Sequence, residues 1–173
     1  MAYRTRTYIA ADFDHDKDAV NILYKWKEDG RLDFDFNDAH ELTQSRDSSL
    51  QCSIKSSLKT RMDASKTFVL IVGNDTNSIT KGSCQYCSSY NSWTCTCARG
   101  HNVDYRSYIK YECDKAVEAG INIIVLYKST IVDKSKCPDA VRYRGNHIAM
   151  EYYYGGQLYW DYYAIKEAFD KVQ

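Results

Sequence analysis

Several features that mark other functional classes are missing from these 173 residues. Lysine and arginine total 23, aspartate and glutamate also total 23, and the formal net charge is therefore zero. Proteins that follow nucleic-acid phosphates carry a basic surface, so we expect no nucleic-acid partner. The apolar runs, such as residues 68–72, are far too short to span a bilayer. No long apolar run follows the charged N-terminal residues, and we expect no signal peptide.

The common nucleotide-binding and serine-activating loops are also missing. The chain has no Gly-x-Gly-x-x-Gly after its first apolar run, no Walker loop and no Gly-x-Ser-x-Gly elbow. Any nucleotide would therefore have to be held by polar loops and aromatic stacking. The seven cysteines are an odd number without a secretion signal, which indicates a cytoplasmic protein with reduced thiols.

Short apolar runs alternate with amphipathic stretches along the chain. Strands are predicted at residues 8–13, 32–36, 67–73, 121–127 and 147–150, helices at 18–29, 48–65, 105–119 and 160–172, and a turn at 152–157. This alternation predicts one domain over residues 1–173 with a flavodoxin-like, doubly wound and mostly parallel sheet. We expect five strands in the order 2-1-3-4-5, with helices on both faces. Residues 74–104 lack any periodicity and form an insert.

The predicted helix over residues 105–119 carries one charge well inside its apolar face. At about 100° per residue, Tyr105, Tyr108 and Ile109 share that face with Glu112. A carboxylate in such a place has to be paired, neutralised or used. Two interpretations stay open: a structural glutamate that reaches the surface or accepts a hydrogen bond from a tyrosine, and a catalytic carboxylate.

A parallel sheet binds ligands at the carboxyl ends of its strands. Four segments are predicted to meet there: the turn at 13–16, the loop at 37–41, the turn at 73–76 and the start of the helix that carries Glu112. The candidate substrate-binding residues of these segments are Phe13, Asp14, His15, Asn37, Asp38, Asn74, Thr76, Tyr105 and Tyr108. At this edge Glu112 could stabilise positive charge on a sugar carbon, act as nucleophile or position a ribose hydroxyl.

Four cysteines lie close together in the insert. Cys84-x-x-Cys87 and Cys95-x-Cys97 place four thiols within a short segment, and His101 follows. Four thiolates at short spacing can close a structural zinc site, although this spacing is not that of a standard zinc ribbon. The alternative is a flexible loop with reduced thiols that acts as a lid over the pocket.

Three segments resemble the TIR-like domain family. Residues 9–16 resemble its first strand and loop, residues 64–76 its third strand, and residues 105–125 its glutamate-bearing helix and the next strand. Tyr108-Ile-Lys-Tyr-Glu112 is similar to the family's pattern around that glutamate. The resemblance covers most of residues 5–130 and looks closest to the ThsB-type subunit of the Thoeris anti-phage system.

This resemblance implies an enzyme that breaks the nicotinamide–ribose bond of NAD+ and cyclises the remainder to a cyclic ADP-ribose isomer. The product would activate a separate effector NADase, no cofactor would be required, and the enzyme could form a homo-oligomer. Glu112 occupies the place of the family's catalytic glutamate. The regions that hold the nucleotide in the family correspond to Phe13, Asp14 and His15, and to Asn37 and Asp38. The chain departs from the family in its long insert and in a tyrosine, Tyr108, where the family usually has tryptophan.

Two other functions remain open from the sequence. The same glutamate could serve as nucleophile in N-glycosyl transfer like that of nucleoside deoxyribosyltransferases. The chain could also be a non-catalytic binding or signalling module, because many flavodoxin-like domains only bind partners.

Overall fold

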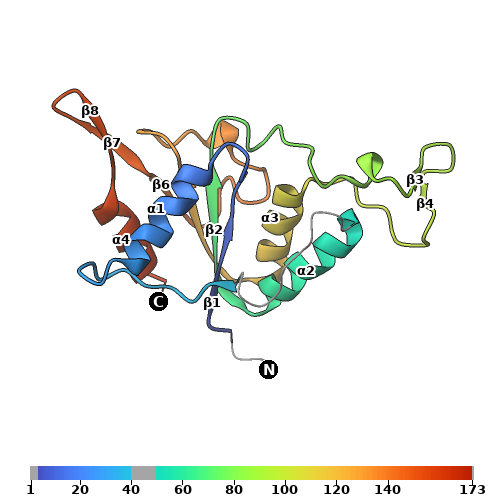
Figure 1. The fold of residues 1–173 in the computed structure, drawn as a ribbon, viewed down its shortest axis with the longest axis horizontal. Helices are drawn as coiled ribbons and strands as arrows, with labels where there is room; N and C mark the ends of the chain where they lie inside the picture. The colour runs from blue at the N-terminus through green and yellow to red at the C-terminus, as the bar shows by residue number, and fades with distance from the viewer. Residues whose placement is uncertain (1–3, 40–49, 173) are drawn as a thin grey trace.

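The centre of the molecule is a parallel sheet (Figure 1). Its strands are β1 (Arg6–Ala10), β2 (Ser65–Val72), β5 (Asn122–Tyr127) and β6 (Asn146–Ala149), in the order β1-β2-β5-β6. The computed structural model describes residues 4–39 and 50–172. The parallel pairing and the order of these strands confirm the predicted doubly wound fold.

Helices cover both faces of the sheet. The helices α2 (Gln51–Asp63) and α3 (Tyr108–Ala119) lie on one face, and α1 (Lys17–Glu28) and α4 (Tyr162–Asp170) lie on the other (Figure 1). Two apolar cores result, one on each side of the sheet. Residues 67–72 of β2 are all buried, because this central strand has a core on each face.

The predicted second strand is not a strand in the described part of the chain. Residues 32–36 are irregular, and the only pairing of a described residue with the outer edge of β1 is a parallel bridge between Thr7 and Asp38. Phe34 and Phe36 are buried, and both rings contact Phe169 of α4. The apolar alternation therefore reflects packing against a helix, and the described sheet has four strands instead of the predicted five.

The turn predicted at 152–157 is shorter than expected: only residues 155 and 156 turn, and two strands that the sequence did not predict occupy the rest. β7 (Glu151–Tyr154) and β8 (Gln157–Trp160) pair antiparallel and form a hairpin that projects from the body of the molecule (Figure 1). Gly155 and Gly156 have φ angles of 57° and 79°, which suit a two-residue hairpin turn.

The insert after β2 forms a second projection. It contains a 3-10 turn, η2 (Cys84–Tyr86), and a minimal hairpin of β3 (Tyr90–Asn91) and β4 (Thr96–Cys97). Figure 1 shows it extending beyond α2 and α3, at the opposite end of the molecule from the β7–β8 hairpin. A further 3-10 turn, η3 (Lys134–Lys136), lies between β5 and β6. None of the helices within residues 4–39 and 50–172 combines the length and apolarity needed to cross a membrane.

Candidate functional site

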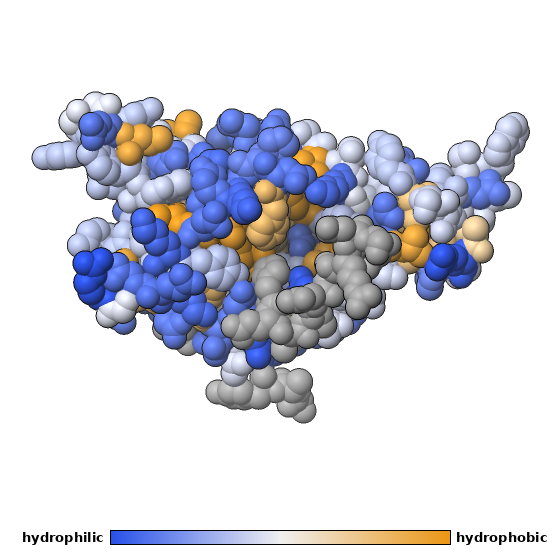
Figure 2. All heavy atoms as spheres, viewed as in Figure 1, coloured by the Kyte–Doolittle hydropathy of each residue, from blue (hydrophilic) through white to orange (hydrophobic). Residues whose placement is uncertain are grey.

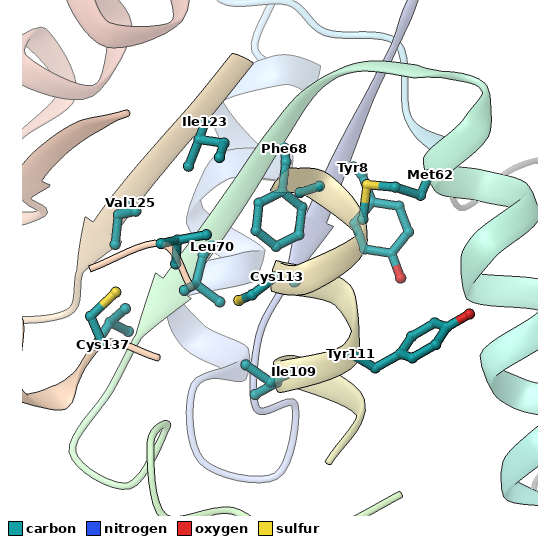
Figure 3. Close-up of a cluster of buried hydrophobic side chains, with 14 of the residues drawn as sticks. Tyr8, Met62, Phe68, Leu70, Ile109, Tyr111, Cys113, Ile123, Val125 and Cys137 are labelled. Atoms are coloured by element: carbon teal, nitrogen blue, oxygen red, sulfur yellow. The ribbon is translucent and has the colours of Figure 1, made fainter. Parts of the chain in front are cut away.

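Glu112 lies inside the core between the sheet and α2. Ser107 caps the start of helix α3, because its side chain accepts a hydrogen bond from the backbone nitrogen of Lys110, and Gly120, with a φ of 61°, caps its end. Glu112 is therefore in the second turn of α3, and it is 7% exposed. Its Oε1 accepts a hydrogen bond from the Tyr8 hydroxyl of β1. Figure 3 shows Tyr8 beside Met62 and Phe68, within the core that α2 and α3 cover.

The surroundings of Glu112 change its acidity. Burial raises the pKa of its carboxyl group from 4.5 to about 7, although the Tyr8 hydrogen bond and the positive charge of Arg61 oppose this increase. Burial also raises the pKa of the Tyr8 hydroxyl well above its ordinary value, and the negative charge of Glu112 adds to that effect. Near neutral pH the carboxyl group is thus about half ionised, so it can exchange a proton or stabilise a cation.

Tyr8 and Arg61 were not among the residues that the sequence singled out. Tyr8 reads as one more apolar residue of a buried strand, and Arg61 as a surface charge of a helix. Arg61 is only 6% exposed, however, and its charge acts on Glu112. The sequence signal for them is indirect, because a buried glutamate requires a donor or cation somewhere in the fold.

The turn after β1 collects several charged side chains at the carboxyl edge of the sheet. His15 Nδ1 lies 2.5 Å from Asp12 Oδ2, and this contact raises the pKa of the exposed imidazole. Asp14 pairs with Lys81 of the insert at 2.7 Å, which lowers the pKa of Asp14. Phe13 is 49% exposed beside them. The predicted turn of Phe13, Asp14 and His15 therefore lies at the expected edge.

The turn after β2 lies against this first turn. Thr76 Oγ1 accepts a hydrogen bond from the backbone nitrogen of Gly73 at 2.8 Å. A Cβ atom on Gly73 would lie 2.3 Å from the carboxylate oxygens of Asp16, so the two turns are in close contact. Asn74 Oδ1 accepts a hydrogen bond from Lys136 at 2.7 Å. Asn74 and Thr76 therefore belong to a turn that contacts the first turn through Gly73 and Asp16.

Lys128, which the sequence analysis did not single out, connects this edge. It follows β5 directly, pairs with Asp18 at 2.6 Å and with Asp16 at 3.6 Å, and donates to the backbone oxygen of His15 at 3.0 Å. Asp16 is 4% exposed, and its burial raises its pKa. The lysine therefore holds the first turn by balancing a buried carboxylate.

Asn37 and Asp38 lie at the other end of β1. The Thr7 nitrogen donates to the backbone oxygen of Asn37 at 2.6 Å, and Asp38 Oδ2 accepts from the Tyr24 hydroxyl at 2.6 Å. Thr7 is the second residue of β1, so these contacts are near the amino end of the strand. The structure thus does not bring Asn37 and Asp38 together with the first turn. Residues 40 and 41 of the predicted loop lie outside the described residues.

Tyr105 and Tyr108 contact the insert. Tyr108 opens α3, and its ring packs on Gly82, where a Cβ atom would come within 2.5 Å of the ring. Burial raises the pKa of the Tyr108 hydroxyl to about 12. Tyr105 precedes the helix, is 52% exposed and has its hydroxyl 3.1 Å from that of Tyr90. The rings of Tyr105 and Tyr108 therefore both contact residues of the insert.

The structure gathers three of the four predicted metal-binding cysteines. Cys84, Cys87 and Cys97 line one small pocket together with Cys52 of α2 and the predicted neighbour His101. Cys95 is exposed, and its thiol is directed to the backbone oxygen of Ser92 at 3.8 Å. All seven cysteines of the chain are free. Within residues 4–39 and 50–172, no group of three or more His, Cys, Asp or Glu side chains is placed so that it could hold a metal ion.

Part of the chain matches a family model. The family model of the Thoeris protein ThsB, TIR-like domain, matches residues 8–81. The match runs from β1 to the start of the insert, so it includes Tyr8 and Arg61 and ends before α3. A search of curated proteins finds no match. The resemblance to the TIR-like family is thus confirmed over residues 8–81.

Proposed function

We propose that this protein cleaves the nicotinamide–ribose bond of NAD+ and cyclises the remainder to a cyclic ADP-ribose isomer. The family match indicates a Thoeris-associated role in defence. The observation that supports the reaction is the position of Glu112. Its carboxyl group is buried on α3, has a pKa of about 7 and accepts a hydrogen bond from Tyr8.

The first step requires a group that stabilises positive charge. When the bond between ribose C1′ and the nicotinamide nitrogen breaks, the electron pair leaves with nicotinamide and C1′ becomes cationic. The ionised Glu112 carboxylate can stabilise this charge, and the effect is strong where water is excluded. Arg61 and Tyr8 favour the ionised form of the carboxyl group, because both oppose the rise in its pKa.

The second step closes the ring. A nucleophilic atom of the adenosine half forms a bond to C1′, and the complete reaction releases nicotinamide and one proton. With a pKa near 7, Glu112 can accept that proton and return it to solvent. The Asp12–Asp16 turn, with Phe13 and His15, would hold the nucleotide, and Asn74 and Thr76 border it.

The burial of Glu112 bears on regulation. At 7% exposure the carboxylate has little direct access to solvent, so substrate access requires a movement of the elements that cover it. This state is consistent with an enzyme that stays inactive until an infection signal releases it. We propose that its product then activates a separate effector NADase of the same defence system.

A substrate comparison tests the chemistry. Lysates of infected cells that express the protein should release nicotinamide from added NAD+, and the Glu112→Gln variant should not. Glu118→Gln is the matched control, because Glu118 lies on the same helix and forms an exposed pair with Lys115. Base exchange between free nucleosides without NAD+ turnover would instead favour a deoxyribosyltransferase-like enzyme. Turnover of neither substrate after infection would favour the binding module.

A further inference from the structure

The insert has very little apolar core of its own. None of residues 85–104 is buried, and Trp93 is 96% and Tyr86 62% exposed. The strands of its hairpin have two residues each. Figure 2 shows the insert as a narrow projection that stands apart from the body. A segment of this kind buries too little surface to order itself, and small units of this type usually depend on a disulfide or a metal ion.

The backbone of the insert brings two short turns together. The Cys87 nitrogen donates to the Cys84 oxygen at 2.9 Å, and the Gly100 nitrogen donates to the Cys97 oxygen at 2.9 Å. The β3–β4 pairing connects the turns, because it sets Cys97 opposite Tyr90. As a result Cys84 and Cys87 of the first turn face the same pocket as Cys97 and His101 of the second.

The side chains at this pocket also have a spacing that suits zinc. Cys84-x-x-Cys87 is one pair, and Cys97 and His101, with three residues between them, are the other. Both intervals are typical of structural zinc sites, in which three cysteines and one histidine are a common ligand set. Cys95 lies outside the pocket, so the irregular Cys-x-Cys spacing no longer counts against a metal.

We propose that Cys84, Cys87, Cys97 and His101 bind one structural zinc ion that orders the insert. The inference does not rest on the proposed NAD+ chemistry. The pocket has a volume of about 10 Å³, and none of the described residues that line it is a carboxylate. As placed, these side chains do not form a group that could hold a metal ion, so the proposal requires them to rotate inward to reach zinc–sulfur distances of about 2.3 Å.

Contacts with α2 hold the end of the insert. Lys55 of α2 is 4% exposed, lines the groove beside Cys84 and donates to the backbone oxygens of Asp104 and Arg106 at the end of the insert. Cys52, on the first turn of α2, also lines the pocket and lies outside the proposed ligand set.

Metal analysis of the full-length protein tests this proposal. Protein purified without chelator, or reconstituted with zinc chloride and desalted, should contain one zinc ion per chain. Cys97→Ser and His101→Ala should lose most of this metal. Cys95→Ser, two residues from Cys97, is the matched control and should keep it, as should Cys52→Ser. A zinc-free wild type after reconstitution would overturn the proposal, and so would an equal loss in Cys95→Ser and Cys97→Ser.

A second measurement does not depend on how the variants fold. Replacing zinc by cobalt(II) in the wild-type protein should give the visible bands of a tetrahedral site and a thiolate-to-metal charge-transfer band in the near ultraviolet. Removal of the metal with a chelator should lower the melting temperature and make the insert more sensitive to protease. Octahedral cobalt spectra, or a disulfide between two of the three cysteines in the native protein, would contradict the site.

Discussion

Replacing Glu112 by glutamine should stabilise the folded protein at alkaline pH. Burial raises the pKa of this carboxyl group from 4.5 to about 7. A group whose pKa is raised by folding favours the folded state below its unfolded pKa. It loses that contribution as the pH rises through the folded pKa. The wild-type protein therefore loses stability between about pH 4.5 and pH 7, as Glu112 is forced to ionise in the core.

The size of the effect follows from the difference in pKa. A shift of about 2.5 units corresponds to about 3 kcal/mol between the two states of the carboxyl group. Glutamine has the same shape, stays neutral and can still accept the Tyr8 hydrogen bond. At pH 8 the variant should gain up to about 3 kcal/mol, which is roughly 6–12 °C in melting temperature for a chain of this size. At pH 4.5 the gain should be close to zero.

Circular dichroism can follow thermal and urea unfolding of both proteins at pH 4.5, 6 and 8. Glu118→Gln is again the control, because the pKa of the exposed Glu118 is lowered by Lys115. Its substitution should therefore have a small effect of the opposite sign. A Glu112→Gln variant that is less stable than wild type at pH 8 would refute the reasoning. So would a stability difference that does not change with pH.

Three further substitutions test the contacts of Glu112 and of Asp16, each by urea unfolding. Tyr8→Phe removes the donor to Glu112 and should cost about 1–3 kcal/mol, with a larger loss at pH 8 than at pH 5. Lys128→Met removes the cation that pairs with the buried Asp16 and should cost about 1–3 kcal/mol at pH 7, with a smaller loss at acidic pH, where Asp16 is protonated. Gly73→Ala places a Cβ atom against Asp16 and should cost about 1–3 kcal/mol at any pH. A wild-type unfolding curve in any of the three would contradict the corresponding contact.

The sequence predicted the layers of the fold because the strongest signals were local. The uninterrupted apolar run of β2 and the amphipathic helices follow directly from which faces are buried. The segment with Phe34 and Phe36 shows where such reasoning fails. Alternating burial looks the same whether the alternate residues pack across a sheet or against the aromatic ring of Phe169.

The candidate site was predictable only in part, because its residues come from distant segments. The helical spacing of the apolar residues was sufficient to place Glu112 on the buried face of the helix. The helix nevertheless begins three residues later than predicted, so Tyr105 lies outside it. The donor from Tyr8 is 104 residues away along the chain, so it depends on how α3 packs on β1. Asp38 likewise lies near the amino end of β1 because it pairs with Thr7, and no local sequence pattern predicts that pairing.

The most direct test of the central claim is mass spectrometry of nucleotides from cells that express either wild type or Glu112→Gln, with and without phage infection. We expect infected wild-type cells to lose NAD+ and accumulate nicotinamide and a cyclic ADP-ribose isomer, and Glu112→Gln cells to show neither change despite equal protein levels. Equal accumulation of the cyclic product in both strains would contradict the role of Glu112.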